Sequence, residues 1–219
     1  MPLRLGVFGG SFDPIHLGHL LVADDVRRQL RLDRILFVPS YRPPHKRGPM
    51  TPYRHRLAMT KLAITGEPEF ELCRIEELRP GPSYTVDTLA RLSVLYPGAA
   101  LHLILGSDQY REISGWCRPQ MLARLARLVV MSRPGTAQPA LFPGHDPRRV
   151  LFRAVIQIAV SAKLVRARLA KAHSVRYMLP VRVNEYVTRH HLYERKVKVK
   201  VKAKTRAAST STSTFTFSS

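Results

Sequence analysis

Short apolar runs alternate with amphipathic stretches along the first 132 residues, and this alternation predicts an α/β fold. Runs with the length or pattern of strands occur at residues 3–8, 34–39, 70–73, 99–105 and 128–132. Apolar residues recur at helical spacing in residues 20–30, 53–65, 85–95, 109–113 and 119–126. A regular exchange of strands and helices favours a doubly wound parallel sheet with helices on both of its faces.

The rest of the chain predicts a connector followed by a helical C-terminal part. Residues 135–149 carry three prolines and little pattern, which is typical of a connector. The apolar run 155–160 predicts a last strand. Ser161 is expected to cap a helix that reaches about residue 172, and a second helix is expected at 181–190. The earlier segment 40–52 is rich in proline and basic residues and predicts a mobile loop.

The segment 195–219 has a different character. Lysine occupies every second position from Lys196 to Lys202, and residues 209–219 are Ser, Thr and Phe throughout. The alternation alone is typical of an edge strand, but lysines so spaced repel one another and leave no opposite apolar face to bury. We therefore expect a disordered tail, basic and then rich in Ser and Thr, after one domain at 1–194.

A glycine-rich turn after the first strand carries the strongest chemical signal. Residues 9–19 read GGSFDPIHLGH and lie between a predicted strand and a predicted helix. Such a turn exposes backbone N–H groups at the positive end of the helix dipole, which suits a phosphate. His16 and His19 lie three residues apart, on one face of the first helical turn. The bare pattern leaves two interpretations open: a nucleotide site, or a tight turn before a helix with two solvent-facing histidines.

Other predicted strand ends add to this signal. They are Pro39, the triplet 106–108 with sequence GSD, and the pair 132–133 with sequence SR. The carboxyl ends of parallel strands meet at one edge of a sheet, and ligands bind there at the point where the strand order reverses. We expect these residues to converge on the turn at 9–19.

Length and composition exclude several classes of protein. A chain of 219 residues with 45% hydrophobic residues can bury one good-sized core. The N-terminal apolar run stops at Gly9, which is too short for a signal peptide, and no stretch approaches the roughly 18 apolar residues of a membrane span. Cys73 and Cys117 are far apart and form no CxxC pair, so neither a disulfide framework nor a zinc site is indicated. We expect a cytoplasmic protein without a membrane partner.

The net charge of +21 is concentrated in the second half of the chain. Residues 1–112 hold 15 Lys and Arg against 12 Asp and Glu, whereas residues 113–219 hold 21 against 3. This imbalance favours anionic partners in general. One hypothesis is a basic nucleic-acid-binding protein. No aromatic residues interleave most of these charges and no common nucleic-acid motif is present, so nucleic acid is not the expected partner.

The turn at 9–19 resembles the nucleotide-binding signature of the adenylyltransferase superfamily, with its HxGH motif. Further stretches resemble bacterial nicotinate-nucleotide adenylyltransferase, and phosphopantetheine adenylyltransferases differ by a typical Thr in place of His16. The resemblance covers residues 3–193, less well at 136–152, and implies a Rossmann-like α/β fold of the nucleotidyltransferase type. The further stretches are PS and PPHK within 39–46, PSYTVDTL at 82–89, LGSD at 105–108, Trp116, and SRPG at 132–135.

The reaction that this resemblance implies joins ATP and nicotinate mononucleotide into deamido-NAD and pyrophosphate, a step of NAD biosynthesis. The attacking phosphate oxygen is already ionised at neutral pH, so the protein has to position two polyanions and stabilise charge. The resemblance implies His16 and His19 as catalytic residues. Mg²⁺ would arrive with ATP and would need no metal cage of protein ligands. The ATP-binding residues it implies are Gly9, Gly10, Ser11, Phe12, His16, His19, Gly106, Asp108, Ser161 and Arg166.

The resemblance also implies residues that bind the mononucleotide. Lys46 would lie over the phosphates, although a solvated loop lysine is the alternative. Trp116 would stack on the pyridine ring, with a place in the core as the alternative. Tyr84 and Thr85 would offer backbone N–H groups to the nicotinate carboxylate. Arg133 would face the mononucleotide phosphate, with a surface ion pair as the alternative.

One motif departs from the family pattern. The family has Ser, then Ser or Ala, then Thr, with Arg three positions further, whereas residues 161–166 read SAKLVR. Lys163 therefore stands in place of a threonine, and Arg166 is retained. A lysine there supplies charge but opposes the helix dipole, so reduced activity is one hypothesis. Nicotinamide mononucleotide or another phosphorylated acceptor is the alternative substrate, and a homo-oligomer is left open.

Overall fold

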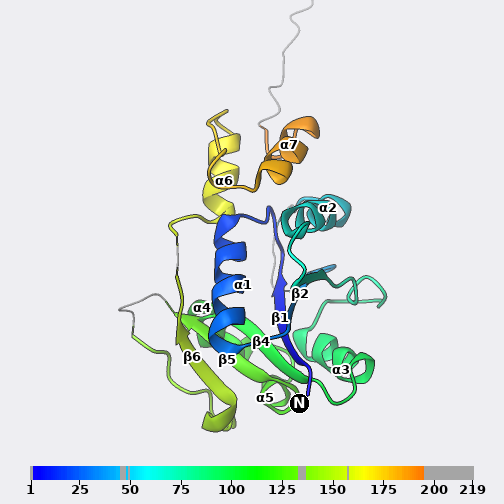
Figure 1. Ribbon diagram of the computed structural model, residues 1–219, viewed down its shortest axis with the longest axis vertical. Helices are drawn as coiled ribbons and strands as arrows, with labels where there is room; N and C mark the ends of the chain where they lie inside the picture. The colour runs from blue at the N-terminus through cyan, green and yellow to red at the C-terminus, as the bar shows by residue number, and fades with distance from the viewer. Residues whose placement is uncertain (1, 45–47, 49, 133–136, 157, 195–219) are drawn as a thin grey trace, which may run out of the picture.

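The computed structural model describes residues 2–44, 48, 50–132, 137–156 and 158–194, which form a parallel six-stranded sheet between helices (Figure 1). The order across the sheet is β3-β2-β1-β4-β5-β6, and all neighbouring strands are parallel. The predicted doubly wound parallel sheet is thus confirmed. The strands are β1 (Arg4–Gly10), β2 (Arg34–Pro39), β3 (Phe70–Leu72), β4 (Ala100–Gly106), β5 (Arg127–Ser132) and β6 (Val150–Ala154).

Helices cover both faces of the sheet, as the alternating pattern predicted. Four helices share a buried cluster on one face: α1 (Leu17–Leu30), α2 (Tyr53–Ile64), α6 (Ala162–Leu169) and α7 (Val181–Arg189). Three helices share the cluster on the other face: α3 (Thr85–Leu95), α4 (Ser107–Arg111) and α5 (Pro119–Leu125). Short 3₁₀ turns occur at Ile113–Gly115 and Pro147–Arg149.

The pleat of the central strands sorts their side chains between these two clusters. In β4, Leu101, Leu103 and Leu105 pack against α3 and α5, whereas Ile104 packs against α1. Successive side chains of a strand point to opposite faces, so a strand covered on both sides is apolar throughout. This requirement explains why the inner strands appear in the sequence as continuous apolar runs.

The last strand lies earlier than the sequence pattern predicted. β6 pairs with β5 from Leu128 opposite Val150 to Ser132 opposite Ala154. The predicted strand at 155–160 is wrong, because its described residues leave the sheet. The Ile156 N–H donates to Asp25 Oδ2 of α1 at 2.8 Å, and the Ile156 side chain is 59% exposed. The apolar run 155–160 therefore connects β6 to α6, and its described residues add no strand to the sheet.

The helices of the C-terminal part follow the prediction with one difference. Ser161 is the N-cap of α6, and its Oγ accepts a hydrogen bond from the Leu164 N–H at 3.2 Å, but α6 ends at Leu169 and not near residue 172. In the predicted loop 40–52, which follows β2, the described residues form neither helix nor strand.

The predicted tail 195–219 lies outside the described residues, so the domain boundary at 194 stays a prediction.

The strand order reverses between β1 and β4. The chain passes from β1 outward to β2 and β3, then crosses to the other side of β1 for β4, β5 and β6 (Figure 1). The register places Gly10 opposite Pro39 and Gly106 opposite Met131, so these strand ends lie along one edge. The expected convergence is confirmed for Pro39 and Gly106, whereas Arg133 lies outside the described residues. This edge is where a doubly wound sheet binds ligands.

Candidate functional site

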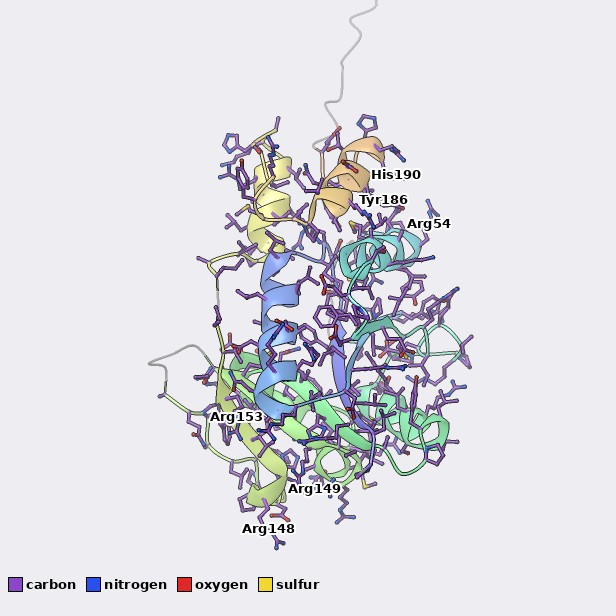
Figure 2. All side chains as sticks on the ribbon, in the orientation of Figure 1. Arg54, Arg148, Arg149, Arg153, Tyr186 and His190 are labelled. Atoms are coloured by element: carbon purple, nitrogen blue, oxygen red, sulfur yellow. The ribbon has the colours of Figure 1, made fainter. Side chains whose placement is uncertain are left out.

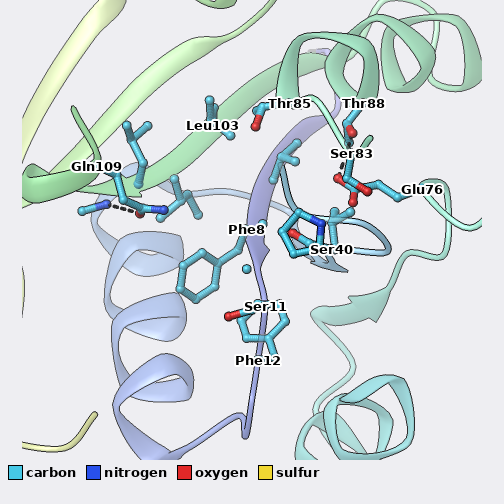
Figure 3. Close-up of a pocket in the computed structure, with 18 of the residues that line it drawn as sticks. Phe8, Ser11, Phe12, Ser40, Glu76, Ser83, Thr85, Thr88, Leu103 and Gln109 are labelled. Atoms are coloured by element: carbon cyan, nitrogen blue, oxygen red, sulfur yellow. Dashed lines mark hydrogen bonds between the residues drawn. The ribbon is translucent and has the colours of Figure 1, made fainter. Parts of the chain in front are cut away.

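A cavity of about 450 Å³ opens at this edge of the sheet, between the ends of β1 and β4 (Figure 3). A volume between about 300 and 1,000 Å³ is typical of a small-molecule site. The cavity brings together residues from the turn after β1, the start of α1, the start of α3 and the end of β4. Nine residues predicted from the sequence line it: Gly9, Gly10, Ser11, Phe12, His19, Tyr84, Thr85, Gly106 and Trp116.

The turn after β1 is held in an unusual backbone conformation. Phe12 has φ +45°, in the left-handed region that residues with a side chain seldom adopt. Its ring folds back into the core against Phe8 and Phe37, and a Cβ on Gly10 would lie 3.0 Å from it. The backbone N–H groups of Ser11 and Phe12 have no hydrogen-bond partner within the part of the chain that the structure describes. The turn therefore offers unpaired donors beside the cavity.

The two histidines of the turn have different positions. The His16 backbone N–H donates to His19 Nδ1 at 3.1 Å, and the two rings stack with centroids 3.7 Å apart. Because His19 Nδ1 accepts this bond, the neutral ring carries its proton on Nε2, a donor available to an anion. His19 lines the cavity, whereas the buried His16 is absent from the lining and lies beside His19.

Burial keeps both rings neutral. It lowers the pKa of His16 from 6.5 to about 4. Burial also lowers the pKa of His19 well below its usual value, and the neighbouring His16 lowers it further. The free protein therefore offers a phosphate neutral imidazole N–H donors. A bound polyanion would favour protonation of these rings.

The glycine between the histidines leaves room for the His16 ring. A Cβ on Gly18 would lie 3.1 Å from Cε1 and Nδ1 of the His16 ring. Beside a larger residue the His16 ring would have to shift by a few tenths of an ångström from its place against His19. The HxGH spacing thus reflects the packing of one ring over the helix start.

The other end of the cavity is formed by the start of α3. Tyr84 is the N-cap, and the N–H groups of Thr85 and Val86 have no partner among the described residues. The Asp87 carboxylate accepts hydrogen bonds from Arg79 and from Arg118, which lies two residues after Trp116. Asp87 therefore ties the start of α3 to Arg79 and Arg118. The same N–H groups of Thr85 and Val86 leave the helix N-terminus available to an anion.

Three polar residues beside this helix start have no assigned role in the sequence-based prediction, although two of them belong to the PSYTVDTL stretch (Figure 3). Glu76 is buried, and its Oε1 accepts from Thr88 Oγ1 at 2.9 Å while its Oε2 accepts from the Tyr41 N–H at 3.1 Å. Ser83 Oγ accepts from the Arg42 N–H at 2.9 Å. Glu76, Ser83 and Thr88 line the cavity and connect α3 to the loop after β2. Ser83 lies within the PSYT stretch and Thr88 three residues after it, so both offered a local signal, whereas Glu76 offered none.

Most of this chain is similar in sequence to nucleotidyltransferases. The sequence model of the cytidylyltransferase-like family matches residues 7–214. A probable nicotinate-nucleotide adenylyltransferase of Thermus thermophilus is 44% identical, over 87% of this chain and 100% of that protein. One of Thermomicrobium roseum is 43% identical, over 87% of this chain and 91% of that protein. The chain belongs to the nicotinate-nucleotide adenylyltransferase family.

Solved structures show the same fold at lower sequence identity. The Plasmodium falciparum nicotinic acid mononucleotide adenylyltransferase complexed with NaAD superposes with a TM-score of 0.71 at 20% identity, covering 87% of this chain and 97% of that one. A putative nicotinate-nucleotide adenylyltransferase of Vibrio parahaemolyticus gives 0.63 at 17% identity, covering 88% and 96%. Both support the nucleotidyltransferase-type α/β fold.

Three residues that the family resemblance assigned to ATP lie off the cavity lining, as His16 does. Asp108 is almost fully exposed and pairs with Arg111 at 2.7 Å, while its neighbour Gln109 lines the cavity. Ser161 caps α6, and the adjacent Ala162 lines the cavity. Arg166 donates from Nη1 to the Asp13 carbonyl oxygen at 2.6 Å. Their contacts with ATP stay predictions. Lys46 and Arg133, assigned to the mononucleotide, lie outside the described residues.

Two further residues beside the site were missed by the sequence-based prediction. Asp13 lines the cavity and is buried, and Arg56 of α2 is the largest fully buried side chain of the described chain. A signal for Arg56 existed, since it lies at helical spacing with Met59, Thr60 and Ala63 on the buried face of α2. A charge on an apolar helix face indicates a buried partner.

Neither a metal-binding cluster nor a membrane span is found in the described part of the chain. The described residues contain no group of three or more His, Cys, Asp or Glu side chains placed to hold a metal ion. Among the same residues, every helix is too short or too polar to cross a membrane.

Proposed function

We propose that this protein transfers the adenylyl group of ATP to nicotinate mononucleotide, giving deamido-NAD and pyrophosphate. The observation that carries the proposal is one cavity with hydrogen-bond donors suited to an anion at each end: the turn after β1 with His19, and the start of α3. The two ends suit two substrates that must meet, one bearing a triphosphate and the other a carboxylate on a pyridine ring. Membership in the nicotinate-nucleotide adenylyltransferase family supports the same reaction.

The chemistry needs no general base. An ionised oxygen of the mononucleotide phosphate forms a bond to the ATP α-phosphorus, and the bond from that phosphorus to the bridging oxygen breaks as pyrophosphate leaves. His19 Nε2 and the N–H groups of Ser11 and Phe12 are the donors that we assign to the charge developing on these phosphates. His16 supports this arrangement by stacking on His19, and its own contact with phosphate stays a prediction.

The acceptor end is suited to a carboxylate. We assign the N–H groups of Thr85 and Val86 to the nicotinate carboxylate, which a helix dipole favours. Trp116 lines the same end, and its flat ring suits stacking on the pyridine. Lys46 and Arg133 are proposed for the substrate phosphates on family resemblance alone.

Nucleotidyltransferases use a divalent cation with ATP, and we assign Mg²⁺ to this role. Mg²⁺ prefers phosphate oxygens and water, so the triphosphate itself would supply most ligands and the protein few. The described lining fits this arrangement, since the carboxylates of Asp13 and Glu76 already accept hydrogen bonds within the protein and the free donors there suit phosphate. The cation would neutralise charge on the phosphates.

The direct test is pyrophosphate release with ATP and either nicotinate mononucleotide or nicotinamide mononucleotide. We expect release with the nicotinate substrate and much less with the amide, which cannot offer a full negative charge to α3. No release with nicotinate mononucleotide from folded protein would refute the proposal, and a preference for the amide would assign the alternative acceptor.

His19→Ala tests the phosphate end of the site. Loss of a donor to a developing oxyanion lowers kcat by about 100-fold to 1,000-fold. We expect a loss of that size with the thermal midpoint little changed. His173→Ala is the matched control, because His173 is exposed and distant from α1 in sequence. Near-normal turnover in His19→Ala would contradict the assigned role.

A further inference from the structure

Three side chains from distant parts of the chain hold the turn after β1. Arg56 Nη1 of α2 donates to the Ser11 carbonyl oxygen at 2.8 Å. Arg166 Nη1 of α6 donates to the Asp13 carbonyl oxygen at 2.6 Å. The Tyr193 hydroxyl, one residue before the predicted domain end at 194, donates to Asp13 Oδ1 at 2.6 Å. The strained turn is therefore fixed from outside the sheet, in part by residues that follow all six strands.

The Asp13 carboxylate is the unusual group in this arrangement. It is 6% exposed and lines a cavity that we assign to a polyanion. Both of its oxygens are bonded, Oδ1 to the Tyr193 hydroxyl and Oδ2 to the Thr51 N–H at 3.3 Å. A buried carboxylate oxygen without a donor is costly, and a free negative charge there would repel the triphosphate.

Tyr193 is well suited to remain the donor. Burial and the contact with Asp13 both raise its pKa far above neutral pH, so the hydroxyl keeps its proton. Arg56 lies near enough for Asp13 to offset part of the effect by which burial lowers the pKa of Arg56. The carboxylate thus has one hydroxyl donor, one amide donor and a buried guanidinium around it.

The C-terminal part is itself anchored to α1 and α2. The Met178 carbonyl oxygen accepts from the Leu17 N–H at 3.0 Å, at the first residue of α1. The Tyr186 hydroxyl lies 2.9 Å from His55 Nδ1 of α2, the residue next to Arg56. Figure 2 shows Tyr186 and His190 of α7 beside Arg54 of α2. These contacts keep Tyr193 within reach of Asp13.

We propose that Tyr193 is a positioning residue that holds the Asp13 carboxylate away from the path of the ATP phosphates and so sets the affinity for ATP. The inference rests on the proposed function only in taking ATP as the nucleotide. Tyr193 does not line the cavity and reaches it only through its bond to Asp13. Its loss should affect ATP binding, and not the binding of the mononucleotide.

The test compares Tyr193→Phe with Tyr177→Phe. Both changes delete one hydroxyl, and Tyr177 is 83% exposed, which makes it the matched control. Calorimetry of the full chain with Mg-ATP and no acceptor gives Kd, and steady-state assays give KM for each substrate. For Tyr193→Phe we expect Kd and KM for ATP to rise about tenfold, the size of a lost bond to a buried charge. KM for the mononucleotide and kcat should stay within about twofold, and Tyr177→Phe should match the wild type.

Two results would overturn the proposal. One is an unchanged Kd for ATP in folded Tyr193→Phe. The other is a fall in kcat with both KM values unchanged, which is what a general loss of folded protein produces. A failure of the wild type to use nicotinate mononucleotide would leave the comparison of ATP affinities intact, so the two hypotheses fail separately.

A second variant separates charge from packing and serves also if Tyr193→Phe is too unstable for assay. Asp13→Asn removes the negative charge that the hydroxyl holds and retains the shape of the side chain. We expect Asp13→Asn alone to bind ATP within about threefold of wild type, and to restore most of the affinity when added to Tyr193→Phe. Tenfold weaker ATP binding in Asp13→Asn alone would refute the role given to the carboxylate.

Discussion

Protonation of the buried His16 should make the protein sensitive to mild acid. The His16 side chain is 6% exposed, and burial lowers its pKa from 6.5 to about 4. In the unfolded chain the same group titrates near 6.5. Between pH 4 and pH 6.5 the His16 ring is mostly protonated in the unfolded chain and mostly neutral in the folded protein. The free energy of unfolding therefore falls as the pH falls through this range.

The magnitude follows from the two pKa values. One pKa unit corresponds to about 1.4 kcal/mol, so the full effect is about 3 kcal/mol. The contribution of the neutral His16 ring to the free energy of unfolding is fully present above about pH 6.5 and is lost by about pH 4. Below about pH 4 this group causes no further loss of stability. His19 is displaced in the same direction and should add to the slope. An effect of this size is a large part of the stability of an ordinary domain, about 5–15 kcal/mol.

Two measurements check this reasoning. Proton NMR of the His16 ring should show titration near pH 4, with the ring neutral at pH 6. Urea unfolding between pH 7 and pH 4 should show a steeper loss of free energy in wild type than in His16→Gln, which cannot take up the proton. His173→Gln, at an exposed position, should follow wild type. Titration of His16 near 6.5, or parallel curves for wild type and His16→Gln, would refute the role of burial.

Three further predictions concern the helix starts and the tail. Lys163→Thr should maintain or raise kcat/KM for ATP, because a cation at the start of α6 interacts unfavourably with the helix dipole, by about 0.3–1 kcal/mol. Lys171→Thr, at an exposed position, is the control. A clear loss of activity in Lys163→Thr would mean that Lys163 contacts phosphate. Gly18→Ala should displace the His16 ring and weaken ATP binding, with a stability loss of about 1–3 kcal/mol; unchanged affinity would contradict the packing argument. Removal of residues 195–219 should leave kcat and both KM values unchanged while abolishing any salt-sensitive binding of DNA or RNA, and lost catalysis would give the tail a part in the site.

Local patterning was sufficient for most of the sheet and its helices. α3 begins and ends at the residues that the sequence predicted, Thr85 and Leu95, because a turn precedes it and an apolar stripe runs along it. The last strand was mislocated because the choice between 150–154 and 155–160 depends on which run pairs with β5. Pairing is a long-range property that periodicity does not contain.

The site was predictable where it follows a motif and not where it depends on packing. The glycine turn, His19 and the start of α3 line one cavity, as expected. That His16 lies beside His19 and off the lining depends on how two rings stack. Asp13, Arg56 and Tyr193 are joined only in three dimensions, so no spacing along the chain relates them. The roles of Lys46 and Arg133, the oligomeric state and the absence of nucleic-acid binding stay predictions.

The hydrogen bond from Tyr193 to Asp13 also bears on the order in which the molecule folds. The two residues are 180 positions apart, so this contact closes a loop that contains almost the whole described chain. Contacts between such distant residues form late, because the entropy of loop closure must be offset by structure that is already in place. The sheet can assemble from its neighbouring strands before the chain end docks. On refolding, we therefore expect the backbone of the nucleotide site to reach its final form after the core that surrounds it.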